Sequence, residues 1–363
     1  MKTKIRSIAI FLAAAIAALC ISGCSMKLSV DDPEDDNVSD LSESALENES
    51  TSTRKARVSV IQYADYSSLN ECREGVEAAL NEAGIGFEVT VGSKNHEKDD
   101  CEQKAQDLAI NSATDLIVCI GTPCAEIVCP IISSAGRTPV VFCAVTDPVG
   151  AGIVENIASP RVNCTGVATA FNIKEQLNMI NTFQPSITKL GVIYTESEQN
   201  TKGQLESLKK AAQALGITVY AEPVEDPSQL SPTAKALMTK VEAVTILPDN
   251  MIAMNSWNIT KQSIVGKIPL YGVNLSQVHE GCLAGYCYDF TSIGKKAGEQ
   301  AIQILHGESA ADMPVIMERE CTLYVNSDRL SDLDMTIPDE YKTAANEVKT
   351  QYETSVSTKN VPD

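Results

Sequence analysis

The sequence of 363 residues lacks the short motifs that mark the common enzyme classes. It contains no GxSxG nucleophile elbow and no GxxxxGK[ST] phosphate loop, and GIGFEV lacks the third glycine of a dinucleotide-binding turn. Its three histidines, His96, His279 and His306, stand in polar or helix-terminal surroundings that are typical of solvated surface side chains. A hydrolase that uses carboxylates alone stays open, although no pair stands out. We therefore expect no enzyme and no cofactor.

The sequence is also poor in positive charge. It has 29 Lys and Arg against 48 Asp and Glu, for a formal net charge of −19. Proteins that bind nucleic acid need a basic surface to neutralise phosphates, so we expect no nucleic-acid partner. No segment beyond the N-terminal region has the length and apolarity of a transmembrane helix.

The N-terminal region has the features of an export signal. Basic residues between Lys2 and Arg6 precede an apolar stretch, residues 8–21, that is too short to span a bilayer comfortably. The following ISGC resembles a bacterial lipobox, in which cleavage leaves Cys24 as the lipid-modified N-terminus; the alternative is an ordinary secretory signal cut near Gly23. We expect a signal peptide over residues 1–23 and an exported lipoprotein, held at the outer face of the cell membrane by acyl chains on Cys24.

Residues 24–56 contain DDPEDDNVSDLSESALENES, a stretch rich in acidic residues and serine with almost no apolar side chains. Such a composition cannot bury enough surface to fold, and its charges repel one another. We expect an acidic disordered tether.

The twelve cysteines raise the question of disulfides, because the chain is expected to be exported. Cys119, Cys129 and Cys143 each stand inside an apolar segment, where a cysteine behaves as a small buried hydrophobe. Zinc bound by Cys119, Cys124 and Cys129 is an alternative, but zinc sites favour CxxC spacing. We expect mainly reduced, buried, non-catalytic thiols and no metal; pairing of Cys282 with Cys287 stays open.

Strands and helices alternate along the rest of the chain at the spacing of βαβ units. In the first half we predict strands at 57–64, 86–93, 114–121 and 138–145, and helices at 67–84, 98–111 and 124–135. The alternation then restarts, with strands at 187–197, 217–224, 241–250 and 268–274, and helices at 200–216, 231–240, 251–267 and 291–307. The predicted fold class is α/β, with two doubly wound parallel-sheet lobes joined by hinge strands and a cleft between them.

Polar residues follow several of the predicted strands. The apolar VVFCAV ends abruptly at Thr146-Asp147-Pro148, and proline cannot continue a strand. An Asp-Pro turn capped by the threonine is the alternative explanation. Open parallel sheets bind ligands beyond the carboxyl ends of their strands, so these positions are candidate cleft residues. The others are Gln62, Tyr63, Thr122, Pro123, Tyr194, Thr195, Asp249, Asn250 and Asn274.

The two kinds of polar group suit a ligand that carries both charges. Thr122 as N-cap and Pro123 at the first helical position would leave backbone N–H groups free to hold a carboxylate. Asp147, Asp249 or Asp289 would pair with an ammonium group. The alternative for Asp249-Asn250 is that they cap the helix that follows.

Several segments together resemble a known family. VIQYADYSSLNECREG, DLIVCIGTPCAE, TPVVFCAVTDPVGAGIV, NCTGVA, LGVIYTESEQNT, LPDN and YDFTSIGKKAG are similar, in order, to exported ABC-transporter substrate-binding proteins, the family that includes tryptophan- and tyrosine-binding lipoproteins. The resemblance runs from about Val58 to Leu330. It implies the type I periplasmic-binding-protein fold, capture of an aromatic or other hydrophobic amino acid, and delivery to an ABC permease. The chain departs from the family pattern at Tyr66-Ser67, where His-Pro is common, and at Pro248, where the family has threonine.

By position, the resemblance implies that the following are cleft residues: Gln62, Tyr63, Thr122, Pro123, Thr146, Asp147, Asp249, Asn250 and Asp289. We expect the ligand carboxylate to meet the amides at Thr122-Pro123-Cys124 and the hydroxyl of Thr146. The ammonium would face Asp249 first and Asp289 second, and Tyr63, Phe171 or Tyr194 would cover the side chain. The alternative function is a bilobal sensor or enzyme acting on another small polar molecule.

The implied lobes are residues 57–167 with 289–322, and residues 168–288 with 323–338. Crossings are expected near Gly166-Val167, Cys287-Tyr288 and Tyr324-Val325, with hinged closure about them. Residues 339–363 should form a polar tail that contributes little to either lobe.

Overall fold

The computed structural model describes residues 56–91, 98–110, 113–136 and 138–351. The expected signal peptide, the lipidation site Cys24 and nearly all of the expected tether lie outside these residues, as do residues 352–363. Within the described part of the chain, no helix is long and apolar enough to cross a membrane.

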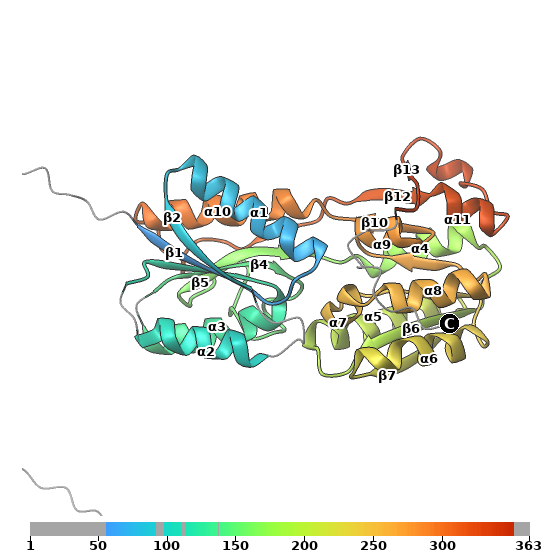
Figure 1. Ribbon diagram of the computed structural model, residues 1–363, viewed down its shortest axis with the longest axis horizontal. Helices are drawn as coiled ribbons and strands as arrows, with labels where there is room; N and C mark the ends of the chain where they lie inside the picture. Colours follow the sequence, from blue (N-terminus) through green and yellow to red (C-terminus); the bar gives the residue numbers. More distant parts are fainter. Residues whose placement is uncertain (1–55, 92–97, 111–112, 137, 352–363) are drawn as a thin grey trace, which may run out of the picture. The chain divides into compact units, whose positions relative to one another are not determined.

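The first sheet has six strands, and every neighbouring pair is parallel. Its central strands form where the sequence has unbroken apolar runs, because both of their faces are buried. In spatial order the strands are β11 (Ile316–Glu318), β5 (Cys164–Thr169), β4 (Val140–Val145), β3 (Leu116–Ile120), β1 (Arg57–Gln62) and β2 (Gly86–Val91). Helices α1 (Ser67–Glu82) and α10 (Phe290–Leu305) cover one face, and α2 (Lys98–Ile110) and α3 (Thr122–Ala135) cover the other (Figure 1). This sheet and these helices are the first lobe.

The second sheet has seven strands, and only β10 and β12 pair antiparallel. In spatial order the strands are β13 (Asn346–Val348), β12 (Thr322–Asn326), β10 (Ala284–Cys287), β9 (Leu270–Gly272), β8 (Ala243–Thr245), β6 (Lys189–Thr195) and β7 (Thr218–Val224). Apolar side chains of α4 (Ile173–Phe183) and α5 (Gln199–Ala214) form the core on one face. Those of α6 (Pro227–Met238), α8 (Trp257–Gly266) and α9 (Leu275–Glu280) form the core on the other. These elements are the second lobe, and the predicted fold class is confirmed.

Helices α1 and α10 pack backbone against backbone. A Cβ atom added to Gly75 of α1 would collide with the carbonyl oxygen of Thr291, and one added to Gly294 of α10 would collide with that of Cys72. Gly298 of α10 lies against the Cβ atom of Ala79. Glycine is required at these positions because no side chain fits between the two helices.

The chain crosses between the sheets close to the predicted places, with small shifts. Gly166 and Val167 lie inside β5, whose pairing with β11 continues to Thr169, so the first crossing comes after that residue. The second follows Cys287, as expected. The third precedes Thr322, because Tyr324 and Val325 already pair within the second sheet. The division of the chain into lobes at the predicted residues stays a prediction.

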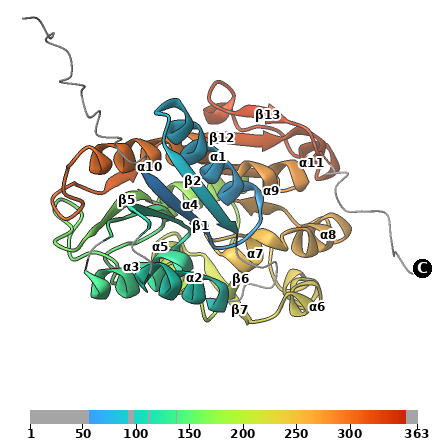
Figure 2. The ribbon, with the colours of Figure 1, turned by 60° about the vertical axis from the view of Figure 1, so that its left-hand side comes forward.

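The prediction of a tail from residue 339 onwards is wrong for its described part. Strand β13 pairs parallel with β12, so the second sheet continues to Val348 (Figure 2). Tyr341 in the short 3₁₀ helix η1 (Asp339–Tyr341) is 7% exposed and stacks on Phe183 with ring centroids 6.0 Å apart. The sequence did not reveal this part of the fold, because most of the segment's residues are polar and few of them are buried.

Two further differences concern short helices. The predicted helix 251–267 is two helices, α7 (Asn250–Met254) and α8, which is preceded by Ser256. Helix α9 follows β9 in a segment for which no helix was predicted. Helices α7 and α9 begin a few residues after β8 and β9, so their first turns lie at the carboxyl end of the second sheet.

Candidate functional site

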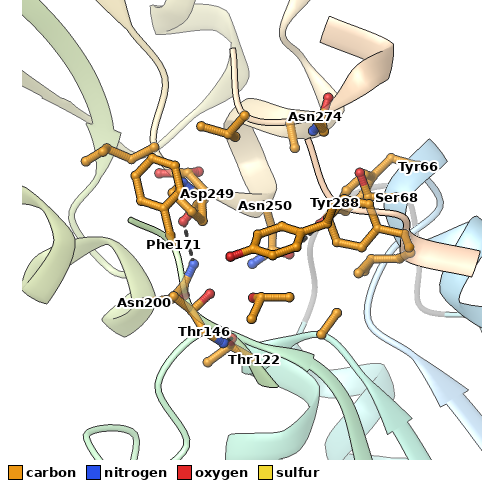
Figure 3. A pocket seen from close by; sticks show the side chains of 18 residues that line it. Tyr66, Ser68, Thr122, Thr146, Phe171, Asn200, Asp249, Asn250, Asn274 and Tyr288 are labelled. Carbon is orange, nitrogen blue, oxygen red and sulfur yellow. Dashed lines mark hydrogen bonds between the residues drawn. The ribbon is translucent and has the colours of Figure 1, made fainter. Parts of the chain in front are cut away.

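A cavity opens between the carboxyl-terminal edges of the two sheets, and both lobes line it (Figure 3). Its empty volume, with the open solvent at its mouth included, is ≈ 610 Å³. The first lobe contributes Tyr66, Ser68, Thr122, Ala144 and Thr146, and the second contributes Asn200, Asp249, Asn250 and Asn274. Residues at the crossings complete the wall: Thr169, Phe171, Tyr288 and Phe290.

The strand β4 reaches the cavity through an unusual backbone conformation. Its pairing with β5 shifts register between Cys143 and Val145. Ala144, at the shift, has φ 56°, a left-handed conformation that residues with a Cβ seldom adopt. Bulges and strained backbone of this kind gather at binding sites, where they redirect the chain. Here the shift directly precedes Thr146 at the cavity wall.

The first turn of α3 forms part of the wall on the first lobe. Its N-cap is Gly121 rather than the predicted Thr122, and Gly121 has φ 97° and no side chain to bond the first N–H groups of the helix. Pro123 is therefore at the second helical position, one residue later than predicted. The Thr122 hydroxyl oxygen accepts from the Thr146 backbone N–H at 3.2 Å, so β4 and α3 are fixed to each other. This helix end carries partial positive charge and suits an anionic group.

The opposite wall, on the second lobe, is negative. Asp249 is the N-cap of α7 and accepts from the Ile252 backbone N–H at 3.0 Å. It also accepts from the Thr195 N–H at 2.7 Å and hydroxyl at 2.9 Å, and from the Thr201 hydroxyl at 3.4 Å. A carboxylate has about four acceptor positions, so the Asp249 carboxylate is saturated by the protein. Capping, the alternative considered for this residue, is what its contacts show.

A second buried carboxylate, Glu198, lies beside it. Glu198 precedes α5 and accepts from the backbone N–H groups of Asn250 and Met251 at 3.0–3.1 Å. It also accepts from the side-chain amides of Asn250 at 2.7 Å and Asn200 at 3.1 Å. Glu198 is 5% exposed and Asp249 is 4% exposed. Among the described residues, no ion pair joins either to a Lys or Arg side chain.

Two neighbouring buried carboxylates disfavour each other's charge. Burial, followed by the charge of Glu198, raises the pKa of Asp249 to about 7. The hydrogen bonds from Ile252 and Thr195 oppose this rise. The negative wall is therefore poised to respond to a cation at neutral pH.

Asn200 connects this negative wall to the cavity. Its side-chain nitrogen donates to Glu198 and, at 2.8 Å, to the Pro248 carbonyl oxygen. Both partners are pure acceptors here, which fixes the orientation of the amide. The Oδ1 atom of Asn200 is buried and has no hydrogen-bond partner within the described chain. Figure 3 shows the side chain at the cavity edge with its nitrogen on a dashed bond.

The structure brings six of the sequence-predicted residues to the cavity and leaves the others outside it, among them Thr195, which bonds Asp249. Those that line it are Thr122, Thr146, Phe171, Asp249, Asn250 and Asn274. Their role in binding stays a prediction. Several residues that line the cavity were not anticipated: Tyr66, Ser68, Asn200, Tyr288 and Phe290. The TESEQNT segment after β6 was the available signal for Asn200 and its neighbour Glu198.

The residues left outside have other surroundings. Gln62 bonds Asn70 and Arg73 within the first lobe, and Tyr63 is buried. Pro123 and Cys124 are buried in α3, with the Cys124 thiol against the Ile61 carbonyl oxygen. The remaining three are distributed as follows: Tyr194 packs against the second-lobe core, Asp147 bonds the Gly150 N–H beside a neighbouring cavity, and Asp289 caps α10 beside a third.

The ten cysteines of the described residues are free, and nine of them are buried. Cys282 and Cys287, whose pairing was left open, are among them. Within the described chain, no group of three or more His, Cys, Asp or Glu side chains is arranged to hold a metal ion.

A family model described as ABC transporter substrate binding protein matches residues 57–349. The chain belongs to this family. Its members are solute-binding proteins rather than enzymes, and they act outside the cytoplasm. The resemblance noted from the sequence is confirmed.

Individual proteins that are similar to this chain include one curated relative and two solved structures. The tyrosine-binding protein of Clostridioides difficile is 28% identical over 92% of this chain and 94% of its own length. An ABC domain from Streptococcus pneumoniae, solved in complex with L-Trp, is 27% identical over 81% of this chain and 99% of that one, with a TM-score of 0.76. The ligand-free, open structure of a C. difficile substrate-binding protein with adhesive properties is 27% identical over 82% of this chain and all of that one, with a TM-score of 0.64.

Proposed function

We propose that this protein is the receptor of an ABC importer that captures an amino acid with an aromatic side chain and delivers it to a permease. The observation that carries the proposal is the division of the cavity wall into three kinds of surface. One is a helix N-terminus, one is backed by two buried carboxylates, and one is aromatic. An amino acid offers a carboxylate, an ammonium and a side chain to match them.

The carboxylate end of the ligand would meet the first lobe. The positive end of α3 and the hydroxyls of Thr122 and Thr146 are groups of the kind that hold carboxylates. The side chain would lie among Tyr66, Phe171 and Tyr288, since aromatic contacts add about 0.5–1.5 kcal/mol beyond area burial. The tyrosine-binding relative and the relative in complex with L-Trp support a ligand of this class.

Calorimetry tests the proposal. The purified protein, refolded after denaturant washing to remove any retained ligand, is titrated with L-tryptophan, L-tyrosine and L-phenylalanine, and with glucose and a nucleoside. We expect stoichiometric binding of at least one aromatic amino acid without turnover. Binding of only the sugar or the nucleoside would contradict the proposal and favour the alternative sensor or enzyme on the same fold.

The proposal includes anchoring through Cys24 at the outer face of the cell membrane. The lipobox-like ISGC segment supports it. The wild type should sediment with membranes in the native bacterium and in a bacterial expression host, and Cys24→Ser should prevent acylation. Mass spectrometry of the processed N-terminus distinguishes an acylated cysteine from an ordinary cut near Gly23, and an unacylated wild type would refute the anchor.

A further inference from the structure

The strongest feature that the proposed function leaves unexplained is an empty hydrogen-bond position in the cavity wall. Asn200 is 8% exposed, yet its Oδ1 atom has no partner within the described chain. A buried carbonyl oxygen without a hydrogen-bond partner destabilises a protein. Such an atom at a cavity wall is expected to find its partner in a ligand.

The surroundings of this atom specify the chemistry of that partner. An amide oxygen only accepts hydrogen bonds, so the partner must be a donor. Glu198 bonds the nitrogen of the same amide and Asp249 lines the same cavity; both are buried and have no Lys or Arg ion pair within the described chain. Two buried negative charges attract a cationic donor over a neutral one.

The two carboxylates themselves have little room for a further donor. Asp249 accepts from Ile252, Thr195 and Thr201, and Glu198 accepts from Asn200, Asn250 and Met251. Glu198 does not line the cavity at all. Of these three side chains, only Asn200 keeps an acceptor without a partner in the described chain, the Oδ1 atom, and Glu198 holds the amide in place through its nitrogen at 3.1 Å.

We propose that Asn200 accepts a hydrogen bond from the ligand's primary ammonium group and makes the protein selective for compounds that carry one, with Glu198 as a positioning residue. This rests on the proposed function and assigns the ammonium end to Asn200 rather than to a direct contact with Asp249 or Asp289. Asp249 lines the same cavity and contributes charge, since its acceptor positions are filled by the protein, and Asp289 lies beside a different cavity.

The test compares each ligand with its deaminated counterpart. L-tryptophan is paired with indole-3-propionate, and L-phenylalanine with 3-phenylpropionate, on the wild type, Asn200→Leu and the control Gln213→Leu. Gln213 is an exposed amide on the same helix, α5. The wild type and the control should bind the amino acid more tightly than its deaminated counterpart. Asn200→Leu should weaken amino-acid binding about 10- to 150-fold, the range for a hydrogen bond to a charged group, and leave the deaminated compound unchanged.

Glu198→Gln gives a second readout. Removing the charge behind Asn200 should reduce amino-acid binding without weakening the deaminated compound. An equal loss for both compounds in Asn200→Leu would overturn the proposal, because it would show a structural role only. Equal affinity of the wild type for both would overturn it without any variant. A wild type that binds no amino acid would refute the proposed function as well, and that result is visible before any variant is made.

Discussion

The Tyr66 hydroxyl donates a hydrogen bond of 2.7 Å to the Asn250 side-chain oxygen, joining the two lobes at the wall of the cavity. Tyr66 directly precedes α1 in the first lobe, and Asn250 opens α7 in the second. Asn250 in turn donates to Glu198. The contact between the lobes and the negative wall therefore share one side chain.

Tyr66→Phe should weaken amino-acid binding about 2- to 10-fold, because it removes one net hydrogen bond that forms when the lobes meet. The ring stays, so its contact with the ligand is preserved. Calorimetry measures the change, and Tyr220→Phe, at a half-buried tyrosine on β7, is the matched control. Equal affinities of Tyr66→Phe and the wild type would show that this bond does not contribute to closure.

Amino-acid affinity should rise as the pH is raised from about 6 to 8. The pKa of Asp249 is raised to about 7 by burial and by the charge of Glu198, and a cationic ligand favours the ionised form. Tyr63 and Tyr66 also face this pair, and burial raises the pKa of both, so they stay neutral in this range. Titrations at pH 7 in buffers of different ionisation enthalpy should detect proton release. Asp249→Asn should abolish it; the same release in that variant would assign the proton elsewhere.

The ligand-free protein should lose the Asp249 contribution to stability as the pH rises through about 7. A carboxyl whose folded pKa lies above its unfolded value stabilises the fold at low pH, and this contribution is lost as the group ionises in the folded state. Urea unfolding at pH 5 and pH 8 measures it. Between pH 5 and pH 8, the free energy of unfolding of the wild type should fall relative to that of Asp249→Asn. A difference that is constant across this range would contradict the assignment.

All ten cysteines of the described residues should titrate as free thiols in the denatured, unreduced protein. In the native protein the half-buried Cys321 should react first with a maleimide, since the other nine are buried. Burial raises the pKa of Cys321 to about 11, so its reaction should be slow at pH 7 and faster at pH 9. Fewer than about half free thiols would favour the disulfide framework instead.

Tyr341→Ala should lower the free energy of unfolding by about 3–5 kcal/mol, the usual cost of truncating a buried aromatic side chain. The loss comes from its stacking on Phe183 and its place in the second-lobe core. Deletion of residues 352–363, which leaves the whole second sheet in place, is the control. Unchanged urea midpoints in Tyr341→Ala would return residues 339–351 to the role of a polar tail.

The alternation of strands and helices was predictable because long apolar runs and helical periodicity are strong signals. Thr122, Thr146 and Asp249 were correctly predicted to line the cavity, because open parallel sheets bind ligands beyond the carboxyl ends of their strands. Short elements such as α9 and β13 escaped, since three to six residues carry little periodicity.

Side-chain direction was harder to predict than backbone position. Cys124 follows Thr122 in the same helix turn, yet its thiol turns toward the Ile61 carbonyl oxygen. The role of Glu198 depends on bonds to residues 52 and 53 positions away, which no local pattern reveals. Asn200 became a candidate only when the partners of its amide nitrogen were known.

The close packing of α1 against α10 at their glycines couples the positions of the two helices. Tyr66 directly precedes α1, while Tyr288 lies in the crossing that leads directly into α10. The positions of Tyr66 and Tyr288 therefore depend on how closely α1 and α10 pack. A Cβ atom at Gly294 would collide with the Cys72 carbonyl oxygen and force α1 away from α10. Tyr66 would then meet Asn250 differently, although no residue of the cavity would have changed.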